Sequence, residues 1–191
     1  IYVRGTPTGG TITWSTPIKL STGIDNARAP SITLKGTELR VAFTNFIDID
    51  SQTVLYTSCR SGCTSASKWS NLLNVSGAIV GANATGPTEV LTDFVHDPYS
   101  DTSYLFFHGT NPSGDDDEFI YTVNNCDNWS ADRQVVTADS TNIRAINPSV
   151  AEANGTLFLA FQVNNGADRQ IYQMYASTLC TRYIYLPIII K

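Results

Sequence analysis

Acidic side chains gather in three separate segments of the chain. The segments read FIDID, SGDDDEF and NGADRQ, and their charged residues are Asp48 and Asp50, then Asp115, Asp116, Asp117 and Glu118, then Asp168 with Arg169. Carboxylate oxygens bind hard cations, and they accept hydrogen bonds from the hydroxyl groups of polyhydroxylated ligands. The segments therefore predict either a ligand site of this kind or ordinary solvated loop tips.

The acidic run 115–118 is the candidate calcium site. Four adjacent carboxylates can supply several of the oxygen ligands that Ca²⁺ prefers, although the run lacks the ligand spacing of an EF-hand loop. Apart from this calcium candidate, we expect no cofactor. The sequence shows no nucleophile elbow, phosphate loop or metalloprotease motif, so we assign no catalytic residue.

Two arginines occur in similar short segments, Arg28 in NARAP and Arg144 in NIRAINP. A guanidinium group offers several donors in a planar arrangement and suits carboxylate or hydroxyl recognition. Such arginines also brace loops by donating to backbone carbonyl groups. We predict that Arg28 and Arg144 belong to the same ligand site as Asp48, Asp50, Asp168 and Arg169.

Composition limits the partners that the protein can have. The chain has 191 residues, a formal net charge of −5 and only 15% charged residues, with no clustered basic surface of the kind that binds nucleic acid. No apolar run reaches the length of about 18 residues that a membrane-spanning helix needs. The low charge, together with many Ser, Thr, Asn and Gly residues, is typical of extracellular β proteins and predicts a secreted or cell-surface location.

The four cysteines are Cys59, Cys63, Cys126 and Cys180, which allow three pairings. Cys59 and Cys63 flank a three-residue loop that a disulfide could close, and the secreted-type composition favours oxidation. We therefore predict a Cys59–Cys63 disulfide. Cys126 and Cys180 either pair with each other or stay free.

A long internal repeat organises the chain. Residues 29–43, APSITLKGTELRVAF, return as residues 147–161, NPSVAEANGTLFLAF, and both Pro30 to Pro148 and Phe43 to Phe161 are separated by 118 residues. Between these copies, apolar and polar residues alternate in short runs that end at Gly, Asn, Asp or Pro, which is the pattern of strands and hairpins. The repeat predicts a duplicated structural unit.

The spacing of the aromatic residues indicates the fold class. Trp14, Trp69 and Trp129 lie 55 and 60 residues apart, which suits an all-β propeller built from four-stranded antiparallel blades. We predict about three and a half blades, with a half blade at residues 1–20 and blades at 29–75, 87–136 and 147–191. A β-sandwich is the alternative, but it does not predict the constant offset of the repeat.

This predicted fold places two sets of loops on one face. They are the loops that enter the first strands and the loops that join second to third strands, so the arginines and the acidic segments would share that face. A ring of three and a half blades is not closed and would expose a sheet edge. We therefore expect an upstream segment or another chain to complete it.

The first units resemble the sialidase-type propellers built from Asp-box (bacterial neuraminidase) repeats. Gly10, Thr13 and Trp14 match the end of the Asp-box pattern S-x-D-x-G-x-T-W, while its Ser and Asp are absent. The resemblance implies a propeller in which an arginine cluster binds a substrate carboxylate, with Arg28 and Arg144 as the arginines of this sequence. It assigns no Tyr or Glu nucleophile.

These observations together favour a non-enzymatic, secreted or cell-surface propeller module that binds a glycan or a protein. One alternative is a fragment of a sialidase-like glycoside hydrolase. Another is an assembly subunit whose half blade is completed by strands of a neighbouring chain. The sequence predicts no nucleic-acid partner and no membrane span.

Overall fold

A computed structural model describes residues 1–48, 51–76, 92–110, 118–125, 129, 133–134, 143–165 and 168–177. Within these ranges the chain is built from antiparallel strands and a short 3₁₀ helix, η1 (Ala66–Lys68). The strands are β1 (Gly5–Thr8), β2 (Thr11–Trp14), β3 (Ala27–Lys35), β4 (Glu38–Asp48), β5 (Ser51–Cys59), β6 (Leu73–Asn74), β7 (Thr92–Asp97), β8 (Thr102–Thr110), β9 (Glu118–Asn125), β10 (Arg133–Gln134), β11 (Ile143–Ala153), β12 (Thr156–Asn165) and β13 (Asp168–Ser177).

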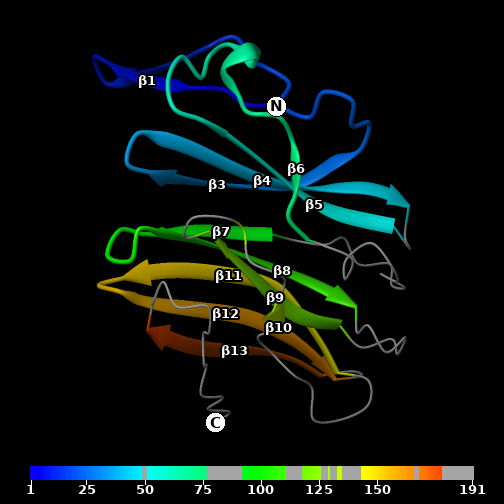
Figure 1. Ribbon diagram of the computed structural model, residues 1–191. Helices are drawn as coiled ribbons and strands as arrows, with labels where there is room; N and C mark the ends of the chain where they lie inside the picture. The colour runs from blue at the N-terminus through cyan, green and yellow to red at the C-terminus, as the bar shows by residue number, and fades with distance from the viewer. Residues whose placement is uncertain are drawn as a thin grey trace.

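The strands form antiparallel sheets that stack in chain order (Figure 1). We call β3–β6 blade A, β7–β10 blade B and β11–β13 blade C. The β1–β2 hairpin lies before blade A, and a single parallel bridge between Arg144 and Glu118 joins the sheets of blades B and C. This arrangement confirms the predicted all-β class with antiparallel propeller blades. Residues 77–91 and 178–191 lie outside the described residues, so the four unit boundaries stay a prediction.

The sequence repeat reappears as a repeated backbone geometry. Pro30 lies on β3 and Pro148 on β11, the first strands of blades A and C, and each lies in an irregularity of the antiparallel register. The residues before them, Ala29 and Asn147, both have a positive φ, of 45° and 55°. Proline has no N–H to donate to a ladder, so a bulge tolerates it. The two prolines therefore occupy equivalent first-strand positions in separate sheets, as the repeat predicted.

The polar residues in the first strand of blade B have partners. This strand is β7, Thr92–Asp97, and it pairs with β8. Asp93 and His96 are polar because their side chains bond to residues beside the strand, Ser31 and Ser103 respectively, and not because they face solvent.

Strand β8 is buried on both faces, and it forms the centre of the core. Its residues Leu105 and Phe107 pack toward blade A, against a cluster that includes Ala42, Val54, Tyr56, Phe94 and the partly buried Trp129. The alternate residues Tyr104 and Phe106 pack toward blade C, against Leu157, Leu159, Phe161 and Met174. The run Tyr104–Phe107 is therefore continuously apolar because both sides of its sheet are covered.

Aromatic side chains fill the spaces between the sheets, as the spacing of the tryptophans predicted. The rings of Tyr56 and Trp129 meet edge to face with centroids 4.9 Å apart between blades A and B. On the other side of blade A, Val41, Phe43 and Leu55 pack against Trp69 and residues of the N-terminal segment. The ring of Tyr2 lies 5.2 Å from that of Trp69. The N-terminal segment is thus packed on blade A.

Substitution of Phe107 with alanine tests this packing. The side chain is fully buried between blades A and B, and removal of a large buried ring costs about 3–5 kcal/mol through lost burial and the cavity left behind. We expect a loss of that size in the free energy of unfolding, measured by urea denaturation. Ile47→Ala removes an exposed apolar side chain of β4 and should change it by less than about 0.5 kcal/mol. Equal losses in the two variants would contradict the proposed core.

Candidate functional site

The loop entries of the three blades share one end of the molecule, which we call the loop face. Antiparallel pairing places the start of β3 beside the end of β4, with Arg28 opposite Thr44, and the start of β11 beside the end of β12, with Arg144 opposite Asn164. The β4–β5 and β12–β13 connections lie at the same ends, and Figure 1 shows these ends together on the right. The described strand ends that these loops join therefore lie at the same end of the molecule.

Two contacts hold the side chain of Arg28 on the loop face. Its Nε donates to Oδ1 of Asn26 at 2.9 Å, and its guanidinium carbon lies 4.1 Å from the centroid of the Phe46 ring. The stacking and the hydrogen bond hold the guanidinium plane in place. Among the described residues, its two terminal amino groups have no protein partner. A half-buried arginine held in this way can donate to a bound ligand at small entropic cost.

Arg144 is not the structural equivalent of Arg28. The repeat offset of 118 residues places Ile146, opposite Gln162, at the level of Arg28. Arg144 pairs with Asn164, the counterpart of Phe46, and so lies two residues nearer the loop end of its strand. Strand β7 lies between β3 and β11 (Figure 1). The two arginines share the loop face but do not form an adjacent pair of matched residues.

The acidic candidates are only partly described. The backbones of Asp48, Glu118, Asp168 and Arg169 lie at strand ends on the loop face. Asp50 and the residues Asp115, Asp116 and Asp117 lie outside the described residues. In the part of the chain that the structure describes, no group of three or more His, Cys, Asp or Glu residues is placed to hold a metal ion. The calcium site at 115–118 therefore stays a prediction.

Sequence reasoning missed a polar layer beneath the loop face. Each second strand carries a phenylalanine followed by a polar residue, and these polar residues are Thr44, His108 and Gln162. Thr44 and His108 are buried, and Gln162 accepts a hydrogen bond from Nδ2 of Asn147 at 3.2 Å. The repeated dipeptides Phe-Thr, Phe-His and Phe-Gln were the signal that could have revealed this layer.

The predicted Cys59–Cys63 disulfide is confirmed, with the two Cα atoms 5.7 Å apart. Cys59 ends β5 opposite Leu39, so the bond lies at the end of blade A away from the loop face. Nearby, the indole Nε1 of Trp69 donates to the carbonyl oxygen of Cys63 at 3.0 Å. The disulfide therefore ties down a turn at the opposite end and does not contribute to the candidate site. Cys126 and Cys180 lie outside the described residues.

Comparison with known proteins identifies the fold. No protein-family model matches the chain, and no curated protein is significantly similar in sequence. Among solved structures, the chain is similar to an α-L-arabinanase of Penicillium chrysogenum complexed with arabinobiose, with a TM-score of 0.63 and 13% identity over 91% of this chain and 53% of that chain. It is also similar to the GH93 α-L-arabinofuranosidase of Fusarium graminearum, with a TM-score of 0.59 and 13% identity over 93% of this chain and 55% of that chain.

A third similar structure is the catalytic domain of the GH62 α-L-arabinofuranosidase of Coprinopsis cinerea, with a TM-score of 0.53 and 15% identity over 85% of this chain and 50% of that chain. The protein is thus a β-propeller that spans about half the length of these neighbours. The likeness supports a propeller but not specifically the sialidase type. Among the described residues, no helix has the length and apolar character needed to cross a membrane.

These neighbours contradict the interpretation of the chain as a non-enzymatic module. Each of the three is named as an α-L-arabinanase or an α-L-arabinofuranosidase, so these three neighbours are enzymes. The sequence carries no complete motif of an enzyme family, and for that reason the interpretation from sequence favoured binding alone. The glycoside hydrolase alternative agrees better with the comparisons.

The buried imidazole of the polar layer makes stability depend on pH. Complete burial lowers the pKa of His108 to about 4, below its value of about 6.5 in an unfolded chain. The fold thus favours the neutral ring. The contribution of this preference to the free energy of unfolding is fully present above about pH 6.5 and is lost as the pH falls to 4. The linkage amounts to about 3 kcal/mol of unfolding free energy.

His108→Gln tests this dependence, because glutamine is the residue at the matching position of blade C. We expect the variant to lose about 3 kcal/mol less than the wild type when urea denaturation is repeated between pH 7 and pH 4. Burial also lowers the pKa of His96, although Asp101 opposes the shift, so part of the pH dependence should remain. Identical pH profiles for the two proteins would contradict the assignment to His108.

Proposed function

We propose that the chain is part of a glycoside hydrolase that cleaves α-L-arabinofuranosidic linkages, with its substrate on the loop face. The observation that carries the proposal is the backbone similarity to the arabinobiose-bound arabinanase over 91% of the chain. Because that identity is 13%, the likeness concerns the fold, and the activity rests on the agreement between fold and loop-face chemistry. An extracellular location suits a glycan substrate and the disulfide.

The side chains of the loop face favour a neutral sugar. Arg28 presents its terminal amino groups next to the ring of Phe46, and aromatic surfaces with a few fixed donors are typical of small-ligand sites. An arabinoside has no carboxylate, so Arg28 would donate to ring or hydroxyl oxygens and would not act as a counterion. This role needs only one arginine. It therefore agrees with the finding that Arg28 and Arg144 lie at different levels of their strands.

Hydrolysis also requires a pair of carboxyl groups on either side of the glycosidic bond. We propose that the acidic strand ends of the loop face, at Asp48, Glu118 and Asp168, are the source of this pair. They lie in three different blades and at the same end as Arg28. Carboxylates from separate blades can flank a ligand that lies over the axis of a propeller.

An activity assay with three substrates tests the proposal. The full-length protein should release p-nitrophenol from p-nitrophenyl α-L-arabinofuranoside or shorten linear arabinan, and should leave a fluorogenic sialoside intact. Arg28→Ala should lower kcat/KM by about 10- to 100-fold, the effect of losing a hydrogen bond from a charged donor. Arg60→Ala is the matched control, because Arg60 is 87% exposed beside the disulfide, away from the loop face. Hydrolysis of the sialoside alone, or of none of the three, would refute the proposal.

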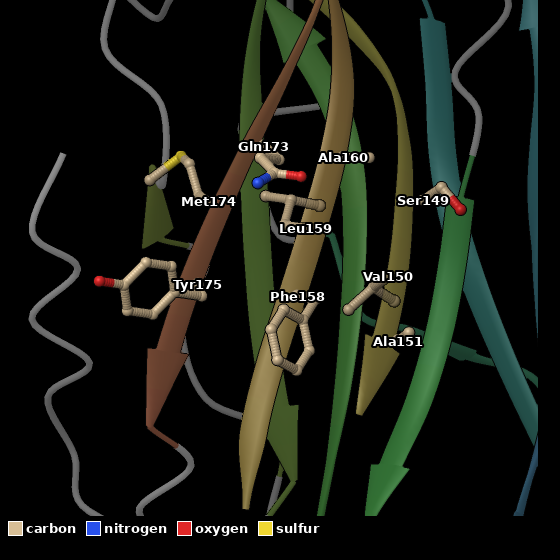
Figure 2. A pocket seen from close by; sticks show the side chains of 9 residues that line it. All are labelled: Ser149, Val150, Ala151, Phe158, Leu159, Ala160, Gln173, Met174 and Tyr175. Carbon is tan, nitrogen blue, oxygen red and sulfur yellow. The ribbon is translucent and has the colours of Figure 1, made fainter. Parts of the chain in front are cut away.

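The outer face of blade C carries exposed apolar side chains, and these indicate how the propeller ring is completed. Phe158 and Tyr175 are cross-strand partners on β12 and β13, and Figure 2 shows their rings. Together with Ser149, Ala151 and Gln173 they line a cavity of about 260 Å³. Phe158 is 48% exposed, Tyr175 is 56% exposed and Ile171, also on β13, is 75% exposed. We call this surface the open face of blade C.

The corresponding faces of the other blades are covered. Arg40 and Ala42 face from blade A toward blade B and are 6% and 0% exposed, while Tyr104 and Phe106 face from blade B toward blade C and are 0% and 3% exposed. The offset of 118 residues makes Phe158 the counterpart of Arg40 in blade C. We propose that a further blade, formed by additional residues of the same protein, covers the open face. The half-length coverage of the neighbouring structures supports this proposal.

Hydroxyl-radical labelling of the full-length protein tests the completed ring. Phe158 and Tyr175 should be labelled much more slowly than Tyr99, which is 71% exposed on the β7–β8 turn. The protection should not depend on protein concentration, and the mass in solution should be that of a monomer. Protection that appears only in a dimer would mean that a second chain covers the face. Labelling at the rate of Tyr99 would mean that nothing covers it.

A further inference from the structure

The first strands of the three blades are held together by side chains. In Figure 1, β7 lies between β3 and β11. Within the described residues, no backbone ladder joins β7 to either neighbour, because β3 pairs with β4 and β11 pairs with β12 and, at one bridge, with β9. Whatever fixes the spacing of these strands must therefore be side-chain contacts between blades.

Asp93 makes such contacts in both directions. Its Oδ1 accepts hydrogen bonds from the hydroxyl group of Ser31 on β3, at 3.1 Å, and from the backbone N–H of Phe94, at 2.9 Å. Its Oδ2 accepts from the backbone N–H of Val150 on β11, at 2.7 Å. The preceding Thr92 donates its hydroxyl to the carbonyl oxygen of Ala29 at 2.8 Å. One half-buried carboxylate thus connects the first strands of three blades.

The sequence repeat shows that this residue is special to blade B. Asp93 pairs with Phe106 on the second strand of its blade, just as Ser31 pairs with Ala42 and Ser149 pairs with Ala160. Blades A and C therefore carry serine at the level where blade B carries aspartate. A hydroxyl has one oxygen and cannot reach both neighbours, whereas a carboxylate has two acceptor oxygens pointing apart. Charge also strengthens each of these hydrogen bonds.

We propose that Asp93 is a positioning residue that holds β3 and β11 at a fixed spacing about β7. Ser31 lies three residues after Arg28 on β3, and Val150 lies six residues after Arg144 on β11, so the carboxylate bonds to the same two strands that carry these arginines. In setting the spacing it determines how the groups from blades A and C meet a ligand. The effect on substrate rests on the proposed function, but the effect on spacing does not.

Distances between spin labels test the spacing directly. Nitroxide labels at Leu34→Cys on β3 and Ala153→Cys on β11, both exposed positions at nearly the same level of their strands, are introduced in a background with Cys126→Ser and Cys180→Ser. Asp93→Asn keeps the shape of the side chain but turns one acceptor into a donor that faces another donor. We expect the distance distribution to broaden or shift in this variant. Asp25→Asn changes an exposed carboxylate near the start of β3 and should leave the distribution unchanged.

Ser31→Ala keeps the test decisive if Asp93→Asn does not fold. It removes only the hydrogen bond from β3 to Asp93 and leaves the bond to Val150. The distance between the labels should therefore change by a smaller amount in the same direction. Unchanged distributions in every folded variant of Asp93 and Ser31 would overturn the proposal. With arabinan as substrate, Asp93→Asn should lower kcat/KM by about tenfold or more, since small displacements of positioning groups have effects of this size. If the wild type cleaves no arabinoside, the proposed function fails while the label distances still decide the role of Asp93.

Discussion

The structure depends on the burial of both faces of each blade against its neighbours. A single four-stranded sheet with apolar residues on both sides cannot shield them from water by itself. Strand β8 shows the solution, because Leu105 and Phe107 pack on blade A while Tyr104 and Phe106 pack on blade C. The aromatic residues are therefore interblade residues, and their spacing along the chain follows the spacing of the blades.

Some of the polar side chains that this packing buries form hydrogen bonds between blades. Arg40 is buried between blades A and B and donates from Nη1 to the hydroxyl group of Ser103 at 2.8 Å. Toward the first strands, Asp93 replaces apolar contact with hydrogen bonds to two other blades. A rigid apolar body with fixed polar contacts at its inner strands suits a site built on loops, because the body positions the loop entries while the loops themselves can vary.

The propeller fold by itself does not decide whether the protein is a binding module or an enzyme. Propellers support binding and catalysis on the same arrangement of sheets, so residue motifs must normally decide between them. Here the Asp-box pattern is incomplete, and it pointed toward sialidase-type propellers. The solved structures that resemble the chain instead include enzymes named for arabinan and arabinofuranosides. Under the function that we propose, Arg28, which is held by Asn26 and Phe46, would donate to a neutral sugar.

The amino-acid sequence by itself determined the all-β class, the repeated unit around Pro30 and Pro148, the disulfide between Cys59 and Cys63, and the end of the molecule on which Arg28 and the acidic strand ends lie. These features follow from short-range patterns, namely alternation, turn residues and a constant offset. Only the tertiary structure decided that Arg28 and Arg144 stand at different levels, that His108 is buried, and that Asp93 bonds to two other blades. Those facts depend on which strands from different blades lie side by side, and a polar residue that bonds across such a contact looks the same in sequence as one that faces water.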